Sequence, residues 1–480
     1  MFHAFTEAVY GIYLAALVWM VLTGVHRVKL LVYSMSKPTV TPPPEPQPWP
    51  AVTVQLPLYN EPNVVVRLLD AIDALDYPPG LLRIQILDDS EDETSALVDD
   101  WLARRGNQTH TCQLIRRAVR SGFKAGALSE GLLHTEDPIV GVFDADFVPP
   151  PNFLRDAVPW MRPGVGMVQA RWGHINHQRN LLTRAQRVLL DGHFLVDQPA
   201  RCARGRWFNF NGTAGIWRRE AIEEAGGWAA DTLTEDLDLS YRSQMEGWTF
   251  VYLEHLVAPA ELPSGMVEFL GQQHRWAKGS VQTVRKIWPR VWRSNAAFAT
   301  KLEAAFHLFA NFGHPAIWLF LLTVPVVTYA KAMRWLETSA HEVWILPLAF
   351  GTFVGVYAVV TWWGSDEPRW RRLNVLPLVF LLGFRLAIPQ TIAVVGGWMR
   401  DGGTFVRTPK AGVELVGAKP RVKGSRSAWE IGTGLYLLCW TPSVLTMGLW
   451  EAALPMGLWA ASHWDRGWVM TRDRATPRQR

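Results

Sequence analysis

Apolar runs lie near both ends of the chain and flank a more polar central section. Residues 8–25 carry no charged side chain, and about 18 such residues suffice for a helix that crosses a bilayer. Two further runs, 304–330 and 343–364, lack Asp, Glu, Lys and Arg. The pattern predicts a spanning helix within residues 1–36 and a region of transmembrane and interface helices over residues 294–480.

The run 373–399 is also apolar, but Arg385, Pro389 and Gln390 interrupt it at mid-length. A charged residue at the depth of the bilayer costs at least about 2.5 kcal/mol. We therefore expect a helix that lies at the cytoplasmic interface, and a full crossing is the alternative.

The last apolar run, 431–462, is broken only by Glu451. It predicts a tight hairpin of two short spans, shaped by Pro442 and Pro455, and one long crossing is the alternative. The hairpin keeps the basic C-terminal tail on the cytoplasmic side, where basic residues tend to remain.

Basic residues also orient the polar section. His26, Arg27 and Lys29 directly follow the first apolar run, and such residues mark the cytoplasmic end of a span. A cleaved signal peptide is the competing interpretation, but its positively charged leader is missing from residues 1–7. We expect a multi-pass protein of the plasma (inner) membrane whose polar domain is cytoplasmic.

The polar section begins with a linker. Residues 37–50 contain seven prolines, which favour an extended polyproline spacer. Residues 51–293 then have the mixed periodicity of a globular domain. Apolar runs at 52–58, 83–87 and 139–143 are typical of buried strands between helices, which predicts an α/β domain with a parallel sheet.

Composition narrows the class of protein. The chain is 49% hydrophobic with a mean hydropathy of +0.03, which excludes disorder and fits a mosaic of membrane and polar parts. Its three cysteines exclude a disulfide scaffold. A net charge of +5 over 480 residues argues against a nucleic-acid partner. Neither a dinucleotide-binding glycine motif after the first strand nor a P-loop occurs.

Carboxylates follow two of the predicted strands. Asp88 and Asp89 follow one, and Asp144 and Asp146 follow the other. Ligands of parallel sheets bind at the carboxyl ends of strands, and Mg²⁺ is usually held by one or two carboxylates together with waters and phosphates. The pair Asp144 and Asp146 is therefore a candidate site for a divalent cation with a nucleotide diphosphate. Solvated loop residues are the structural alternative.

Thr234-Glu235-Asp236 begins a predicted helix. The structural interpretation is an N-cap followed by acids that the helix dipole favours. A carboxylate fixed at this point is also a candidate general base.

Gln272, Arg275 and Trp276 share one face of another predicted helix. They are either interfacial anchors or the wall of a polar pocket. In the second interpretation Arg275 neutralises phosphate and Trp276 stacks on a sugar ring.

Taken in order, six motifs resemble the inverting glycosyltransferases of family 2, and above all their membrane-integrated, processive branch. They are Tyr59-Asn60-Glu61, Asp88-Asp89-Ser90, Lys124-Ala125-Gly126, Asp144-Ala145-Asp146, Thr234-Glu235-Asp236 and Gln272-Gln273-His274-Arg275-Trp276. The strings VQARW, LLTR, FNGTAGIWR, EAGGW and QQHRW are similar to the cellulose synthase-like A and C group of mannan and glucan synthases. The resemblance is dense over residues 52–290 and looser in the membrane part.

The resemblance implies a GT-A fold, which is an α/β glycosyltransferase domain, and a role for each matching residue. The residues implied for the nucleotide sugar are Asp88 or Asp89, Lys124, Asp144, Asp146, Gln272, Arg275, Trp276, Arg407, Thr408 and Lys410. The residues implied for the acceptor are Phe210, Asn211, Gly212, Thr213 and Trp276. Asp144 and Asp146 would hold Mg²⁺ or Mn²⁺, and Asp236, beside Glu235, would be the catalytic base.

Residues 405–410 resemble the gating loop F-x-V-T-x-K of this family, within a gating-like segment at 401–412, with Arg407 in place of its Val. A loop that contacts a nucleotide must be cytoplasmic. This independently favours the interface helix at 373–399.

The expected reaction is inverting transfer of a hexose from a UDP- or GDP-hexose donor to a glycan or lipid acceptor, which forms a β-glycosidic bond. Processive synthesis of a β-glucan or β-mannan coupled to membrane translocation is the first hypothesis. Single-step glycosylation of a membrane lipid (ceramide, diacylglycerol or a polyprenyl lipid) is the alternative, and a transporter or scaffold with a degenerate domain is the non-enzymatic one. The donor sugar, the linkage and any accessory subunit stay open.

Overall fold

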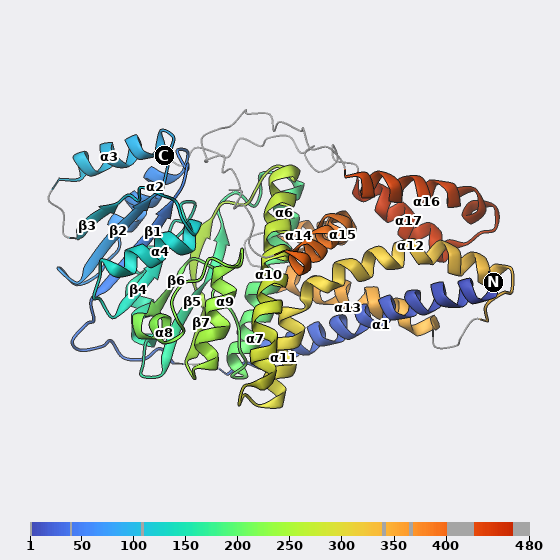
Figure 1. Cartoon of the computed structure of the whole chain (residues 1–480), viewed down its shortest axis with the longest axis horizontal. Helices are drawn as coiled ribbons and strands as arrows, with labels where there is room; N and C mark the ends of the chain where they lie inside the picture. The colour runs from blue at the N-terminus through green and yellow to red at the C-terminus, as the bar shows by residue number, and fades with distance from the viewer. Residues whose placement is uncertain are drawn as a thin grey trace.

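The computed structural model describes residues 2–38, 41–106, 110–337, 342–363, 368–400 and 427–463. The gating-like segment 401–412 and the basic tail lie outside these ranges. Within them, a body of sheet and helices lies at one end of the molecule, and a group of long helices extends from it (Figure 1).

A seven-stranded sheet forms the centre of the body. Its strands are β1 (Val52–Leu58), β2 (Leu82–Asp88), β3 (Thr111–Ile115), β4 (Ile139–Val142), β5 (Val165–His174), β6 (Gly215–Arg218) and β7 (Thr249–Ala260). Their order is β3-β2-β1-β4-β6-β5-β7. The predicted strands match β1, β2 and β4 closely, because all three are apolar runs buried on both faces.

The sheet is mixed, so the prediction of a parallel sheet was wrong in one respect. β6 runs antiparallel to both β4 and β5, whereas the other neighbours pair in parallel. The register pairs Gly215 at the start of β6 with Val142 at the end of β4. The segment before β6 therefore reaches the same edge of the sheet as the carboxyl ends of the parallel strands.

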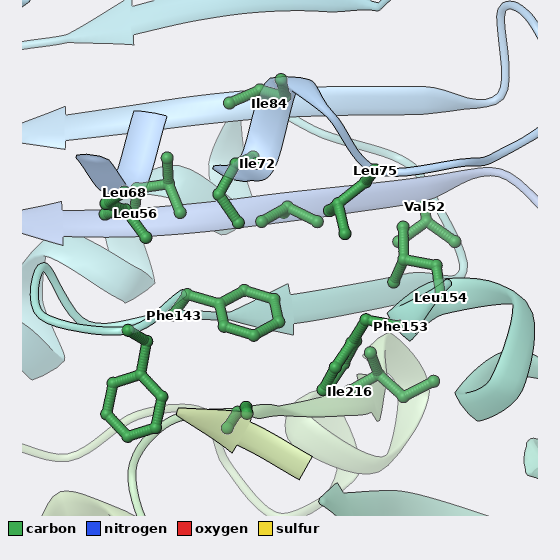
Figure 2. Close-up of a cluster of buried hydrophobic side chains, with 14 of the residues drawn as sticks. Val52, Leu56, Leu68, Ile72, Leu75, Ile84, Phe143, Phe153, Leu154 and Ile216 are labelled. Atoms are coloured by element: carbon green, nitrogen blue, oxygen red, sulfur yellow. The ribbon is translucent and has the colours of Figure 1, made fainter. Parts of the chain in front are cut away.

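Helices cover both faces of the sheet. They are α2 (Val65–Asp73), α3 (Thr94–Arg105), α4 (Phe123–Leu133), α5 (Phe153–Ala157), α6 (Leu181–Gly192), α7 (Gln198–Ala203), α8 (Arg219–Glu224), α9 (Glu235–Met245) and α10 (Met266–Arg293), with a 3-10 turn at Val158–Trp160 and a π-type turn, η2, at His193–Asp197. On one face, Leu68 and Ile72 of α2 pack with Leu56 of β1 and with Phe143 and Phe153 (Figure 2). Burial of such side chains stabilises the fold by roughly 1.5–3 kcal/mol each.

The remaining helices form the apolar part. They are α1 (Phe2–Met35), α11 (Phe298–Leu308), a 3-10 turn at Ala310–Phe312, α12 (Gly313–Ala332), α13 (Glu342–Trp363), α14 (Arg369–Leu373), α15 (Leu376–Met399), α16 (Ala428–Thr446) and α17 (Trp450–Ser462). Four described segments are long and apolar enough to cross a membrane, by length and composition: Ala4–Met35, Ala310–Ala332, Trp344–Trp363 and Arg369–Met399.

The predicted run 304–330 is two elements. Its first residues belong to α11, and the candidate span begins only at Ala310. Ala304 and Leu308 of α11 pack against Val284, Ile287 and Val291 of α10. This contact explains why the run is apolar before the span starts.

α15 runs beside α10. His274 Nδ1 lies 3.2 Å from the Pro389 carbonyl oxygen, and Gln282 Nε2 donates to the Arg400 carbonyl at 3.0 Å. The contacts advance in the same direction along both helices, and α10 belongs to the body that carries the sheet. The interface helix stays a prediction, since Arg369–Met399 is also long and apolar enough to cross a membrane.

The charge in α15 is compensated. Arg385 is buried and forms an ion pair with Glu430 of α16, which is buried as well. A buried guanidinium is tolerated when a carboxylate pairs with it, so the cost of the Arg385 charge, from which the interface position was predicted, is reduced in α15.

Both helices of the predicted C-terminal hairpin are present, as α16 and α17. The turn between them contains Gly448, with φ +64°, a backbone conformation that favours glycine. Pro442 and Pro455 lie inside the two helices, so the prediction that they shape the turn was wrong.

Candidate active site

One edge of the sheet holds a cavity of about 200 Å³. The carboxyl ends of β1, β2, β4, β5 and β7 and the start of β6 meet there. The sequence-predicted residues that line the cavity are Asp89, Lys124, Asp144, Asp146, Asn211, Gly212, Glu235, Asp236, Gln272, Arg275 and Trp276. Residues from six separate parts of the chain therefore face one space.

Lys124 joins two sides of this cavity. Its ammonium pairs with Asp144 and donates to the Gly212 carbonyl at 2.8 Å. Burial alone lowers the pKa of Lys124, but the carboxylates of Asp144 and Glu235 outweigh it and raise the pKa above its usual value. Lys124 thus stays cationic and ties the strand-end carboxylates to the loop before β6.

Asp88 does not face the cavity, unlike Asp89. Its buried carboxylate accepts hydrogen bonds from Ser90 N at 3.0 Å, Ser95 Oγ at 2.8 Å and Arg116 Nε at 2.9 Å. Burial alone raises the pKa of Asp88, but these hydrogen bonds outweigh it and hold the pKa below its usual value. Asp88 supports the turn after β2, and of the two acids only Asp89 lines the cavity.

Two arginines that were not predicted as ligands, Arg117 and Arg120, lie beside Asp89. The Arg120 guanidinium carbon lies 3.3 Å from the centroid of the Tyr59 ring, and both side chains line the cavity. Arg117 Nε donates to Asp89 Oδ1 at 3.0 Å. The arginines follow β3, a short strand that the sequence pattern did not reveal, so their position at the edge was not foreseen.

Glu235 and Asp236 form an acidic pair in the cavity wall. Burial, and after it the charge of Glu235, raises the pKa of Asp236 to about 7. Burial also raises the pKa of Glu235, while Lys124 opposes the shift. A carboxylate with a pKa near neutrality is well matched to proton transfer.

The start of α9, which carries this pair, is not capped in the predicted way. Thr234 does not cap α9 through its side chain, because its Oγ1 lies 3.1 Å from Thr283 Oγ1 of α10. α10 comes close at Gly279, where a Cβ atom would lie 2.7 Å from Thr234 Cγ2. The loop before α9 is therefore held by α10 and not by a cap.

α10 presents Gln272, Arg275 and Trp276 to the cavity from one face, as the spacing predicted. His274, from the same motif, faces α15. Burial lowers the pKa of Arg275, and the carboxylates of Glu235, Asp144 and Asp236 partly offset that effect.

The segment predicted for the acceptor divides into two pairs. Asn211 and Gly212 line the cavity, and at Gly212, with φ +81°, a Cβ atom would lie only 3.0 Å from Asp236 Oδ2. Phe210 and Thr213 are fully buried beneath them. Thr213 Oγ1 accepts a hydrogen bond from the Asp144 backbone N–H at 2.9 Å, so this pair supports the loop instead of lining the site.

Three further predicted residues, Arg407, Thr408 and Lys410, lie outside the described residues together with the rest of segment 401–412. Their predicted contact with the nucleotide stays a prediction.

The donor set fits a divalent cation shared with phosphates. Asp144 and Asp146 both line the cavity, and no group of three or more His, Cys, Asp or Glu that could hold a metal occurs among the described residues. Mg²⁺ and its analogues commonly take one or two carboxylates and complete their shell with substrate phosphates and water. The mutual repulsion of Asp144, Glu235 and Asp236 further favours a cation.

Comparisons with known proteins identify glycosyltransferases that are similar to this chain. The family model described as Glycosyl transferase family group 2 matches residues 139–364. A protein of Oryza sativa subsp. japonica named probable glucomannan 4-beta-mannosyltransferase 3 is 42% identical over 245 residues, which cover 50% of this chain and 44% of that protein. An Arabidopsis thaliana protein named probable glucomannan 4-beta-mannosyltransferase 15 is 35% identical over 334 residues, which cover 66% of this chain and 62% of that protein.

The chain spans about half the length of the curated relatives it matches. Among solved structures, the mannosyltransferase PcManGT from Pyrobaculum calidifontis, in complex with GDP-Man and Mn²⁺, is similar with a TM-score of 0.54 and 22% sequence identity. The match covers 82% of this chain and 99% of that chain. This likeness confirms the predicted GT-A-type fold.

Proposed function

We propose that this chain, whose residues 139–364 match the model described as Glycosyl transferase family group 2, transfers mannose from GDP-mannose to the end of a growing β-1,4-linked mannan. The observation that carries the proposal is the cavity in which Asp236, the pair Asp144 and Asp146, and the loop residues Asn211 and Gly212 face one space. The names of the relatives, which are 4-beta-mannosyltransferases, and the GDP-Man in the structural neighbour support the choice of sugar and nucleotide.

The proposed reaction is a single displacement at the anomeric carbon. Asp236 takes the proton of the acceptor hydroxyl as that oxygen attacks, and its raised pKa suits this step. Lys124 and Arg275 stabilise the charge that develops on the departing GDP. Because attack comes from the face opposite the leaving group, an α-linked donor gives a β-linked product.

Asp144 and Asp146 are the proposed ligands of the divalent cation, and Mn²⁺ in the structural neighbour supports this role. When bound, such an ion supplies positive charge to the diphosphate. Asp89 and the stacked pair Tyr59 and Arg120 are the proposed nucleoside site, because they stand beside the diphosphate residues at the same edge.

A second cavity, of about 280 Å³, supports coupling of synthesis to membrane passage. It lies between α1, α12, α13 and α15 and reaches Asp197 and Arg201 of the catalytic body. Its lining includes the aromatic residues Phe306, Phe350, Phe353, Phe380 and Phe384, which suit the apolar faces of sugar rings. We place the catalytic body on the cytoplasmic side of the plasma membrane, where GDP-mannose would be supplied.

The test uses the purified full chain with GDP-mannose and Mn²⁺. Wild-type protein should form a β-linked polymer that an endo-β-1,4-mannanase digests. Asp236→Asn should abolish transfer and retain GDP binding. Transfer by Asp236→Asn near the wild-type rate would overturn the role of the base, and an organic-extractable glycolipid product would overturn processive synthesis in favour of lipid glycosylation.

A further inference from the structure

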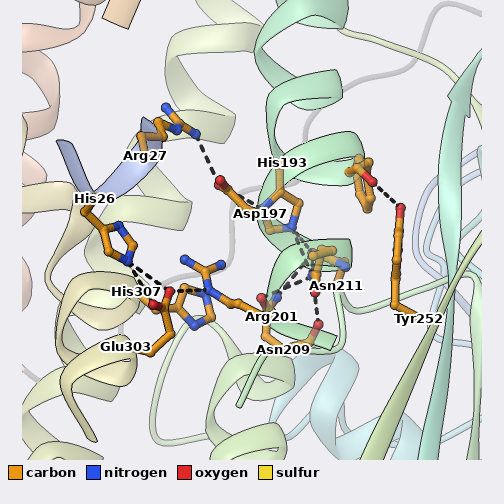
Figure 3. Close-up of polar contacts among 12 residues, drawn as sticks. His26, Arg27, His193, Asp197, Arg201, Asn209, Asn211, Tyr252, Glu303 and His307 are labelled. Atoms are coloured by element: carbon orange, nitrogen blue, oxygen red, sulfur yellow. Dashed lines mark hydrogen bonds and ion pairs between the residues drawn. The ribbon is translucent and has the colours of Figure 1, made fainter. Parts of the chain in front are cut away.

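The helical segment that connects β5 with the loop before β6 is irregular in its middle. α6 passes into α7 through the π-type turn η2 at His193–Asp197. Such turns are rare and occur frequently at functional sites. Here the turn lies between the membrane helices and the loop that carries Asn211 (Figure 3).

On its membrane side, η2 is tied to two spanning helices. Arg27 Nη2 of α1 donates to Asp197 Oδ2 at 3.2 Å, and Arg27 Nη1 donates to the Tyr357 hydroxyl of α13 at 2.8 Å. Burial alone raises the pKa of Asp197, but the charge of Arg27, together with His193 and Arg201, outweighs it and holds the pKa well below its usual value. Asp197 is therefore a buried anion compensated from the membrane part.

On its catalytic side, the same turn holds the Asn211 amide. His193 Nε2 lies 2.9 Å from Asn211 Oδ1, and Asn209 Nδ2 donates to that oxygen at 3.2 Å. Gln198 Nε2, which lies 3.1 Å from the same ring nitrogen, donates to the Asn209 carbonyl at 3.0 Å. Because Asn209 Nδ2 donates to it, Asn211 Oδ1 is an acceptor, and His193 donates to it in the tautomer that carries the proton on Nε2.

These contacts determine which atom of the Asn211 amide is already hydrogen-bonded. Its oxygen is held by His193 and Asn209, while Nδ2 is buried without a hydrogen-bond partner among the described residues. A buried donor without a partner is unfavourable by about 1–3 kcal/mol in other proteins, which makes its satisfaction by a ligand favourable. Asn211 lines the active-site cavity next to Gly212 and Asp236.

We propose that His193 and Asp197 are positioning residues through which α1 and α13 orient the Asn211 amide to donate a hydrogen bond to the acceptor sugar. The inference rests on the proposed function and adds a specific determinant of acceptor affinity. Acceptor binding then depends on the membrane anchor, because Arg27 and Tyr357 hold Asp197 and η2 in place.

A second anchor of α1 provides a matched control. Glu303 of α11 lies 3.0 Å from His26 Nε2 and accepts hydrogen bonds from Lys29 Nζ at 3.0 Å and Arg201 Nε at 3.1 Å. Lys29 is on the same helix as Arg27 and makes the same type of bond, but to a residue other than the η2 anion. Lys29→Met therefore perturbs the packing of α1 but leaves in place the residues that connect it to Asn211, which are Arg27, Asp197 and His193.

The experiment measures binding of β-1,4-mannotetraose, binding of GDP with Mn²⁺, and transfer from GDP-mannose, all with the full chain in nanodiscs. His193→Ala should raise the Kd and KM for mannotetraose about 10-fold or more, the effect typical of a lost hydrogen bond that leaves a buried partner unsatisfied. The Kd for GDP should not change. His193→Gln, which keeps an N–H donor, should restore most of the affinity, and Lys29→Met should match wild type.

Tyr357→Phe, which removes one oxygen from the far end of this connection, should weaken mannotetraose binding by a smaller factor and tests the proposal if His193→Ala does not fold. Unchanged mannotetraose affinity in both His193→Ala and Tyr357→Phe would overturn the inference, and so would equal defects in His193→Ala and His193→Gln. If wild-type protein still transfers mannose, the proposed function stands in either case. Wild-type protein that neither binds mannotetraose nor transfers mannose would overturn the proposed function and the inference with it.

Discussion

Replacement of Gly212 by alanine would place a methyl group against the proposed catalytic base. An ideal Cβ atom at this position lies 3.0 Å from Asp236 Oδ2 and 3.5 Å from Lys124 Nζ. The first distance is too short for an ordinary contact, so the carboxylate must shift by a few tenths of an ångström. The backbone, at φ +81°, adds strain of about 1–2 kcal/mol for a residue with a side chain.

The two effects can be separated with a matched variant. Gly205 also has a positive φ, +58°, but a Cβ atom there meets nothing within 4 Å. Gly205→Ala therefore carries the backbone strain alone. Both variants should lose similar thermal stability, whereas only Gly212→Ala should lose kcat.

The expected loss follows from the sensitivity of catalysis to position. A misplacement of about 1 Å can lower a rate about 100-fold, so a shift of a few tenths of an ångström in Asp236 should lower kcat about tenfold. The assay is transfer from GDP-mannose at saturating donor and acceptor, with GDP affinity as the check on the donor side. Equal kcat values for Gly212→Ala and Gly205→Ala would refute the placement of Asp236 beside the reacting hydroxyl.

Three further predictions concern the charges of the site. Asp144→Ala with Asp146→Ala should remove the strengthening of GDP binding by Mn²⁺ in calorimetry, and metal-dependent binding at wild-type strength would contradict the metal site. Lys124 lowers the pKa of Asp236, so Lys124→Met should move the acid limb of the kcat/KM profile to higher pH, whereas the surface variant Lys301→Met should leave it in place. The folded-state pKa of Asp236 lies above its unfolded value, so stability is lost as pH rises from about 4 through about 7. Asp236→Asn should therefore raise the unfolding temperature more at pH 8 than at pH 5, and equal increments at both values would contradict this.

The sequence predicted the parts of the fold whose signals are local. β1, β2 and β4 are apolar runs buried on both faces, and the helix spacing of Gln272, Arg275 and Trp276 placed all three on one face. β3 was not predicted, because this short edge strand contains polar residues and is only partly buried. The direction of β6 was not predictable either, since it depends on where the preceding helices and loop bring the chain.

The same distinction applies to the site. The motifs indicated which segments carry chemistry, but Asp88, Phe210 and Thr213 turned out to support the cavity from behind it. Their burial depends on neighbours distant in sequence. Arg120 and His193 had no local signal, because one follows an unrecognised strand and the other acts through a π-type turn.

Arg385 shows how an ion pair distant in sequence changes the meaning of a pattern. In isolation, a charge in the middle of an apolar run indicated a helix at the membrane interface and not a crossing. The buried partner Glu430, 45 residues away, compensates the charge of Arg385 inside α15.

The central claim is that the cavity around Asp236 forms β-mannosidic bonds from GDP-mannose. The most direct measurement is the anomeric configuration of the first bond formed, read by NMR of the product from GDP-mannose and β-1,4-mannotetraose with the purified full chain. Wild-type protein should form a β-linked mannopentaose, and Asp236→Asn should form none. An α-linked product, or equal product from both proteins, would contradict the proposed role of this cavity.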